Sequence, residues 1–459
     1  MEGLIRINDA VNRIVWGAPM LALLIGVGLL LTIRTRGFQF RRFGYAMKNT
    51  LGKIFGRKPA GAGEITPFQA MTTALAGTVG TGSIAGVTAA VTLGGPGAIF
   101  WLWMSALIGM VTKYSEVLLA VKYRERNEHG EWVGGPMYYI RNGLGKKWAR
   151  LGSLFCIFAA LASFGTGNAV QVGNITTSVV TVITTFSPDF ARVDLANLII
   201  GGVVTLLAAV VLFGGIKRLG AVTERLVPAM AVIYVLASLA VVALHVRAVP
   251  GVLAAIFQGA FSPAGVTGGA VGSGLLALSW GLKRGVFSNE AGLGSAPMAH
   301  ATTSEKDPVL QGLYGIFEVF MATIVICTLT GLALLCSGVP IPYGTMGDTS
   351  LNVAALGTVF GGKGGSLVIA IGISLFAFST ILGWALYGMS CCQYLWGYRA
   401  VLPFKIVFLS VIFLSSALEL SLVWDIADTL NGLMAIPNLV GLLGLSGVVV
   451  RETRKHFEK

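Results

Sequence analysis

Three glycines interrupt an apolar stretch near residue 80, and hydroxyl side chains alternate with them. The segment from Ala74 to Ser83 reads ALAGTVGTGS. Each glycine weakens a helix by roughly 1 kcal/mol, so we expect the helix to unwind here. Glycines also serve close helix packing, but Gly77, Gly80 and Gly82 fall on different helix faces, which one packing seam does not explain. Unwound backbone offers carbonyl groups to a cation and N–H groups to an anion, so this segment is a candidate binding site.

A second apolar stretch, residues 270–300, contains charged residues well inside it. It includes LALSWGLKRG, from Leu276 to Gly285. Charges inside an apolar stretch are costly and are usually functional. We therefore predict a second interruption, centred on Ala277 and Ser279. Interruptions in corresponding positions of two halves of a chain indicate a ligand site between them.

Other polar side chains stand out in apolar surroundings. Ser379 and Thr380 are adjacent, and their hydroxyl oxygens suit a hard cation, although such hydroxyls also bond back to the carbonyl four residues earlier. Gln171 lies in the apolar run 150–182, where it either contacts a ligand or bonds to another helix. Trp384 follows Thr380 by about one turn, so its ring either limits ligand size or packs against neighbouring helices.

Four carboxylates, Glu116, Glu224, Glu290 and Glu318, also lie within or near apolar runs. Each could carry a proton, although Glu290 could instead stabilise a helix start. The four histidines form no cluster with a nucleophile, and no HExxH motif occurs, so an intramembrane enzyme is not indicated. The five cysteines show no CxxC spacing of a metal site.

The elements that must position these residues follow from the composition. Of 459 residues, 55% are hydrophobic and only 12% are charged, with a mean hydropathy of +0.78. Soluble domains carry about 25% charged residues, whereas runs of about 20 apolar residues each cross a bilayer as a helix. We therefore expect an all-α polytopic membrane protein of about 11 spans. They are predicted near 14–33, 67–91, 97–122, 150–182, 194–213, 219–246, 270–300, 309–337, 364–396, 402–418 and 422–448.

Lysines and arginines alternate between the two predicted faces. They gather in the loops 34–66 and 122–150 and at the C-terminus, so that face is expected to be cytoplasmic and the N-terminus outside. The net charge of +13 is thus explained by topology rather than by nucleic-acid binding. The short apolar segment 350–360 is expected to form an extracytoplasmic loop helix.

Four motifs resemble one known family. They are TVGTG from Thr78, GGPGAIFW from Gly94, GGPMYY from Gly134 and RGVFSNEAGLG from Arg284. They look like those of the alanine or glycine:cation symporter family, from about residue 65 to the C-terminal spans. The resemblance implies a LeuT-like bundle of five plus five inverted helices with one extra N-terminal span. Residues 1–65 would form that span and a basic loop, and 66–459 the core, with repeats at 66–246 and 270–448.

The resemblance further implies sodium-coupled uptake of alanine or glycine across the bacterial inner membrane, with sodium as the coupling ion and no other cofactor. The implied sodium ligands are the carbonyls of Ala76, Val79 and Phe376 with the hydroxyls of Ser379 and Thr380. For the substrate, we expect the N–H groups of Thr81 and Gly82 to meet the carboxylate. The carbonyls of Thr78, Ala277 and Ser279 would meet the ammonium group, with Gln171 and Trp384 nearby.

One residue departs from the pattern: Ser83 stands where the family usually has asparagine. The chain is expected to work as a monomer in the lipid bilayer. Proton coupling remains an alternative. An ion channel is a further alternative, but it would need a repeated pore filter and usually oligomeric symmetry, which the two-half plan does not supply.

Overall fold

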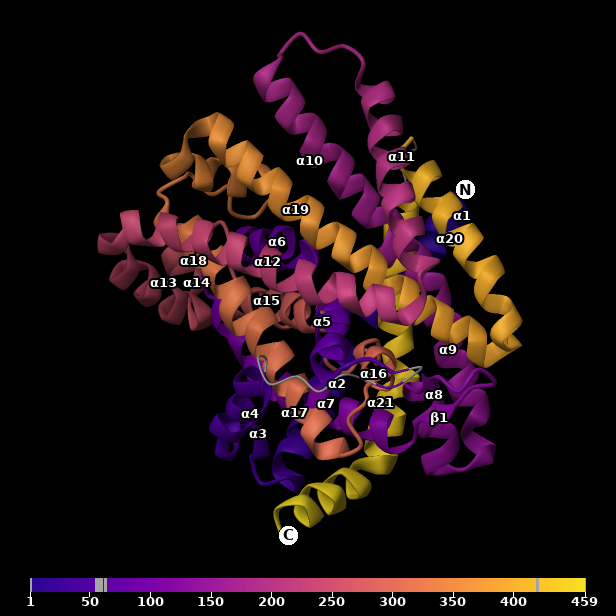
Figure 1. The fold of residues 1–459 in the computed structure, drawn as a ribbon. Helices are drawn as coiled ribbons and strands as arrows, with labels where there is room; N and C mark the ends of the chain where they lie inside the picture. The colour runs from indigo at the N-terminus through magenta and orange to yellow at the C-terminus, as the bar shows by residue number, and fades with distance from the viewer. Residues whose placement is uncertain (1, 54–60, 62–63, 418–420, 459) are drawn as a thin grey trace.

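The computed structural model describes residues 2–53, 61, 64–417 and 421–458 as a bundle of helices (Figure 1). Parts of the basic loop predicted at 34–66 therefore lie outside the described residues. The described strands are β1 (Glu125–Arg126) and β2 (Trp132–Val133), which pair antiparallel. In Figure 1 the connection between α10 and α11 lies at one end of the bundle and the C-terminal turn of α21 at the other.

The helices of the first half, in chain order, are α1 (Glu2–Val15), α2 (Ala18–Arg34), α3 (Phe38–Arg41), α4 (Phe43–Thr50), α5 (Pro67–Thr78), α6 (Ala85–Gly94), α7 (Ala98–Lys122), α8 (Pro136–Tyr139), α9 (Ala149–Phe164), α10 (Val170–Phe186), α11 (Val193–Leu212) and α12 (Gly215–Leu244). Those of the second half are α13 (Val249–Phe261), α14 (Pro263–Thr267), α15 (Gly274–Asn289), α16 (Ala296–His300), α17 (Pro308–Val319), α18 (Thr328–Cys336), α19 (Ser350–Trp396), α20 (Val401–Ser415) and α21 (Ser421–Phe457).

Short 3₁₀ and π turns join some of these helices. The 3₁₀ turns are Leu51–Lys53, Thr81–Ser83, Lys146–Trp148, Val246–Ala248 and Tyr398–Ala400, and the π turns are Ile140–Leu144, Gly165–Ala169 and Phe320–Cys327. The turns at Gly165–Ala169 and Phe320–Cys327 join α9 to α10 and α17 to α18, so each pair is one long, locally widened helix. Such widened turns are frequent at functional sites.

Within the described residues, nine helices are long and apolar enough to cross a membrane. A tenth crossing is the pair α5 and α6, bent by 65° at the glycine-rich segment. The span predicted at 270–300 consists instead of two shorter helices, α15 and α16, joined by a turn. Nine or ten candidate crossings are therefore found among the described residues, against about eleven expected, and the difference is the segment 270–300.

Two predictions about these helices can be compared with the structure: the loop helix at 350–360 and the extra N-terminal span. Gly361 has φ 72° and ψ 164° inside α19, so residues 350–360 form a separate helix from the long span that follows, as expected. The N-terminal span made by α1 and α2 packs on α7 and α21. The Asn12 amide and the Trp16 indole N–H both donate to Asp428 of α21, at 3.1 Å and 2.9 Å.

The start of α5 is specified by its own sequence. The Thr66 hydroxyl accepts from the Gln69 N–H at 3.1 Å, and the Gln69 side chain accepts from the Thr66 N–H at 3.0 Å. This reciprocal cap, with Pro67 in the first turn, satisfies two N–H groups that the helix leaves free. The Gln69 amide also donates to Glu224 of α12 at 2.8 Å, which ties the start of α5 to a neighbouring span.

Candidate functional site

The first break begins where α5 loses its helical direction at Val79, which has φ −86° and ψ 80°. Gly80 is extended, and its N–H donates to the Thr78 carbonyl at 3.1 Å rather than to Ala76 four residues earlier. The Ala76 carbonyl is thereby released from the helical ladder. Unpaired carbonyls are tolerated inside a membrane only where they line a cavity or are buried in protein.

Oxygen atoms of α19 lie against this released carbonyl. The Ser379 hydroxyl is 3.4 Å from the Ala76 oxygen, and it donates to the Phe376 carbonyl at 2.8 Å. The Thr380 hydroxyl donates to the same Phe376 carbonyl at 2.9 Å. Each hydroxyl thus bonds to a carbonyl of its own helix, which was one of the two alternatives that the sequence allowed. The same hydroxyls also bring oxygen atoms of α5 and α19 together. All of these side chains are fully or almost fully buried.

Glycines bring the backbones of α5 and α19 into direct contact. A Cβ atom at Gly383 would lie 2.5 Å from the Gly77 nitrogen, and one at Gly80 would lie 2.7 Å from the Thr380 hydroxyl oxygen. A Cβ atom at Gly77 would lie 2.6 Å from the Tyr387 hydroxyl oxygen and 2.8 Å from its ring. Only glycine fits at these positions without movement, so part of the glycine pattern serves packing and part serves the unwound backbone.

The 3₁₀ turn Thr81–Ser83 leads from the break into α6. Its first hydrogen bond runs from the Ser83 N–H to the Gly80 carbonyl at 3.1 Å. The N–H groups of Thr81 and Gly82 come before this bond, so they lie outside the hydrogen-bond pattern of the turn. The Thr81 hydroxyl lies 3.3 Å from the Gln171 side-chain oxygen and accepts from the Asn174 amide at 3.1 Å. Residues of α10 therefore face the turn, and Gln171 lies at the break.

Trp384 is fully buried against the π turn between α9 and α10. A Cβ atom at Gly167 would lie 2.1 Å from the Trp384 Cβ, so this glycine makes room for the indole. Among the described residues, the indole N–H has no hydrogen-bond partner. Trp384 and Tyr387 contact edge to face at 5.6 Å. The ring lies one turn from Thr380, as the spacing predicted.

The second break is not where the sequence predicted it. The helix α15 runs without interruption from Gly274 to Asn289, through Ala277 and Ser279. A Cβ atom at Gly94, in the last turn of α6, would lie 3.3 Å from the Ala277 Cα, so Ala277 sits at the far end of α6 from the first break. The prediction that these two carbonyls belong to a helix break is wrong.

The interruption lies at residues 290–295, after the charged residues rather than among them. Glu290 ends α15 in a left-handed conformation, and Gly292 and Gly294 also have positive φ. A Cβ atom at Gly82 would lie 3.3 Å from the Phe287 ring, so the last turn of α15 covers the first break. The two breaks therefore lie at the same level of the bundle. The second break was predicted in the correct segment, 270–300, but too early along the chain.

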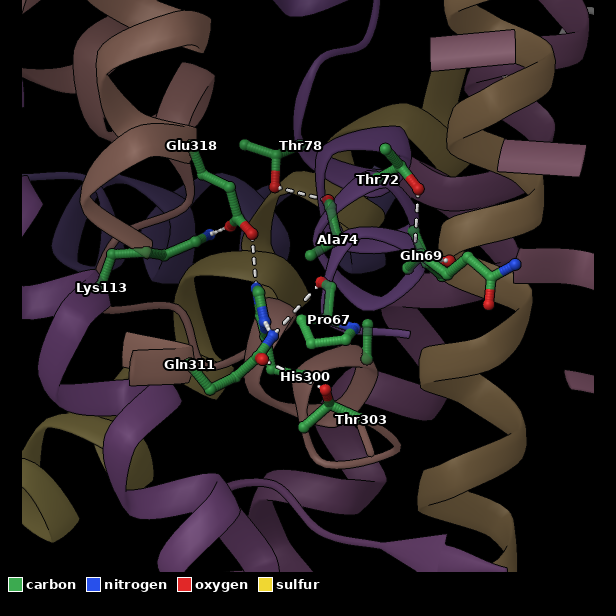
Figure 2. Close-up of polar contacts among 12 residues, drawn as sticks. Pro67, Gln69, Thr72, Ala74, Thr78, Lys113, His300, Thr303, Gln311 and Glu318 are labelled. Carbon is green, nitrogen blue, oxygen red and sulfur yellow. Dashed lines mark hydrogen bonds and ion pairs between the residues drawn. The ribbon is translucent and has the colours of Figure 1, made fainter. Parts of the chain in front are cut away.

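Charged side chains surround the second break, although they come from distant parts of the chain. Figure 2 shows Lys113 of α7 and His300 of α16 both pointing toward Glu318 of α17. Lys113 donates to the Asn289 carbonyl at 3.0 Å and lies 4.0 Å from the Glu318 carboxylate. Glu116 accepts from the Gly292 N–H at 3.1 Å. These side chains are completely buried.

A hydrogen-bonded chain continues from Glu318 to the start of α5 (Figure 2). His300 Nε2 contacts the Glu318 carboxylate, and His300 Nδ1 lies 2.8 Å from the Gln311 amide nitrogen. The same amide nitrogen lies 3.5 Å from the Pro67 carbonyl. The end of α15 and the first turn of α5 are thus joined through four side chains, those of Lys113, Glu318, His300 and Gln311.

Sequence reasoning missed two contributors to this region. Asn174 bonds to Thr81, and its position three residues after Gln171, on the same helix face, could have indicated it. Phe287 was missed because the break was placed too early, whereas Glu290 was named as a carboxylate but not as part of the break. Ser83 ends the turn next to α18: its carbonyl accepts from the Thr330 hydroxyl at 3.0 Å, and its buried hydroxyl has no hydrogen-bond partner among the described residues.

The chain is similar to known membrane transporters over its full length. The model of the sodium:alanine symporter family matches residues 1–459. The sodium/alanine symporter AgcS of Methanococcus maripaludis is 44% identical over 455 residues, covering 98% of this chain and 96% of its own length. The probable sodium/glutamine symporter GlnT of Bacillus subtilis is 36% identical over 442 residues, covering 95% and 87%.

Among solved structures, MhsT in complex with L-phenylalanine matches with a TM-score of 0.58 at 15% identity, covering 85% of this chain and 89% of that one. At that identity the likeness speaks for the fold alone, and it confirms the LeuT-like expectation. The family and its members are cation-coupled amino-acid symporters rather than enzymes. With a match along its entire length, this chain belongs to the sodium:alanine symporter family.

Proposed function

We propose that the protein couples sodium entry to the uptake of a small neutral amino acid, alanine or glycine, by alternating access. The observation that carries this proposal is the approach of the Ser379 hydroxyl to the released Ala76 carbonyl, 3.4 Å apart on different helices. Hydroxyl and carbonyl oxygens are the ligands that hard cations prefer. A cation held there would fix α5 against α19.

The proposed sodium ligands are those expected from the family resemblance. They are the carbonyls of Ala76, Val79 and Phe376 and the hydroxyls of Ser379 and Thr380. The approach of Thr380 to Gly80 supports this set, because it brings the second hydroxyl to the unwound backbone. No charged side chain is needed for a monovalent ion in a site made of dipoles.

The proposed substrate site is the next turn of the same break. The substrate carboxylate would meet the N–H groups of Thr81 and Gly82, ahead of α6, where the helix dipole favours an anion. The ammonium group would meet the Thr78 carbonyl and Gln171. Trp384 would limit the side chain to a methyl group or a hydrogen atom, which favours alanine and glycine over a longer amino acid such as glutamine.

The proposed orientation places the N-terminus outside and the C-terminus in the cytoplasm of a bacterial cell, in the inner membrane. Contacts among the basic loops support a common face. Lys122 pairs with Glu452 at 2.9 Å, and His456 contacts Asp307 at 2.7 Å. We further propose that residues 66–246 and 270–448 are the two inverted repeats of one core, and that a monomer suffices for transport.

Uptake into proteoliposomes tests the proposal directly. Labelled alanine and glycine should accumulate when sodium is higher outside, and glutamine should compete poorly. A potassium gradient of equal size is the control for membrane potential. Absence of sodium-dependent uptake of both amino acids would refute the proposed function. Trp384→Leu should increase competition by glutamine; unchanged selectivity would remove the ring from the substrate site.

A further inference from the structure

Glu290 lies where the two breaks meet, and its backbone is unusual. Its φ of 52° is costly for a residue with a Cβ atom, and such conformations gather at functional turns. Its side chain is only 4% exposed and contacts Thr78, the last residue of α5. One carboxyl group therefore joins the ends of two half-helices.

The charges around Glu290 do not balance. Lys113 is the one lysine that interacts with all three buried carboxyl groups, Glu116, Glu290 and Glu318, in the described part of the chain. An uncompensated charge in the interior costs several kcal/mol. The cluster must therefore bind protons or a cation. A buried carboxyl group can bind a proton without further ligands, and the hydrogen-bond partners of each group indicate where that proton would be.

His300 does not hold the extra proton. The Pro67 carbonyl can only accept, so the Gln311 atom that faces it at 3.5 Å is the NH₂ group, and the amide oxygen accepts from the Thr303 hydroxyl at 3.1 Å. That NH₂ group also faces His300 Nδ1, which must accept its hydrogen bond. His300 is therefore neutral, with its proton on Nε2 directed at Glu318.

Hydrogen-bond donors surround two of the three carboxyl groups. Glu116 accepts from the Gly292 N–H at 3.1 Å and from the Asn438 amide at 2.5 Å. Glu318 accepts from His300 and lies beside Lys113. These donors reach the Oε1 atom of each group, where they stabilise the charged form. The Oε2 atom of each has no hydrogen-bond partner among the described residues, so no neighbour is placed to accept from a proton there.

Glu290 differs in having a neighbour that offers a lone pair. The Ser295 hydroxyl donates to one carboxyl oxygen of Glu290. The Thr78 hydroxyl, however, donates to the Ala74 carbonyl at 3.0 Å, so its oxygen is left as an acceptor. Tyr387, whose phenol interacts electrostatically with Glu290, likewise donates its hydrogen bond to the Ala74 carbonyl at 3.3 Å. A protonated Glu290 can donate to Thr78, whereas an ionised one cannot.

We propose that Glu290 is a proton-binding residue of the transporter, which keeps its proton while the two breaks are in contact and uses it to donate a hydrogen bond to the Thr78 hydroxyl oxygen. Loss of that proton would leave a further uncompensated carboxylate against the end of α5 and would weaken the contact between α5 and the second break. The link to transport rests on the proposed function, but the protonation itself does not.

Infrared spectroscopy of the purified full-length protein tests the protonation without transport. At neutral pH in D₂O, the wild type should show the band of a protonated carboxyl group. The band should weaken in Glu290→Gln and persist in Glu318→Gln, the matched control. A wild type without the band, or equal intensity in Glu290→Gln, would overturn the proposal. Should Glu290→Gln fail to fold, Glu290→Asp should shift the band, and an unshifted band would equally overturn it.

Alanine binding at different pH values tests the coupling. One linked proton changes apparent affinity by up to about tenfold per pH unit. The wild type should show such a dependence, and Glu290→Gln, whose amide can donate to Thr78 at every pH, should lose it. A pH dependence that is the same in both proteins would overturn the coupling. Because the infrared result needs no sodium gradient, failure of sodium-dependent uptake would be distinguishable from failure of this proposal.

Discussion

The two breaks interrupt helices at the same level of the bundle by different chemical means. The first, around Gly80, contains glycines and hydroxyls and exposes backbone oxygen to α19. The second, at residues 290–295, is surrounded by Lys113 and three buried carboxyl groups. A site made of carbonyl and hydroxyl dipoles can bind and release a monovalent cation at a small cost in free energy. A cluster of buried charges, in contrast, holds the segments that carry them tightly together. We infer that the first break binds the ligands and the second ties moving segments together.

The charged cluster should tolerate substitution least. Lys113→Met removes the cation that all three carboxyl groups share, and removing one partner of a buried pair costs roughly 3–5 kcal/mol. We expect loss of folded protein or a large drop in thermal stability in detergent. Lys113→Arg should be much milder, and so should the double variant Lys113→Met with Glu318→Gln, which removes both charges. A stable single variant would show that the cluster does not depend on Lys113.

The first break should be sensitive to volume rather than charge. Gly383→Ala places a methyl group 2.5 Å from the Gly77 nitrogen, and overpacking of this kind costs roughly 1–3 kcal/mol. We expect sodium-dependent uptake to fall roughly 10- to 100-fold, the equivalent of that energy. Gly372→Ala, on the same helix but with its new methyl at 3.7 Å from Tyr234, is the matched control. Equal effects at the two glycines would contradict direct backbone contact.

A smaller effect is expected for a single ligand of the proposed cation site. Thr380→Ala removes one hydroxyl, and the loss of one hydrogen-bonding group costs about 1 kcal/mol, or several-fold in sodium affinity. The sodium concentration for half-maximal uptake should rise while uptake at saturating sodium is retained. Ser374→Ala is the control, because this hydroxyl of α19 has no hydrogen-bond partner among the described residues. Unchanged sodium dependence in Thr380→Ala would exclude that residue from the site.

The smallest effect is expected for an ion pair near the surface, ahead of α5. Burial acts to raise the pKa of Glu64, but hydrogen bonds from Trp132 and Arg126 outweigh it and hold the pKa below its usual value. The contact is therefore present at neutral pH and is lost as the pH falls through the lowered pKa. Such pairs contribute less than about 1 kcal/mol. The indole N–H signal of Trp132 in an NMR titration should move at that pH, and in Glu64→Gln it should not.

The sequence identified the helical class, most of the spans and the first break because each depends on local composition. Glycines at residues 77–82 weaken any helix, and apolar length alone marks a span. The second break was misplaced because charged residues near Lys283 and Arg284 were taken as the interruption. Those side chains remain on a continuous helix next to aromatic rings, with Lys283 5.6 Å from the ring of Trp16.

The buried cluster could not be assembled from the sequence. Lys113 and Glu318 are about two hundred residues apart, and no spacing rule connects α7 to α17. Glu290 was recognised as a carboxylate in an apolar region, but its role depends on which neighbours donate and which accept. That distinction requires the bond between the Thr78 hydroxyl and the Ala74 carbonyl, which only the folded chain provides.

The burial of Trp384 has an optical consequence. Its indole N–H lacks a hydrogen-bond partner among the described residues, and its ring lies one turn from the proposed cation ligands. An indole in such surroundings emits at shorter wavelength than one in water, and a nearby dipole or charge alters that emission. The chain holds nine tryptophans, so a variant that keeps Trp384 alone would carry an intrinsic fluorescent reporter of occupancy at the first break.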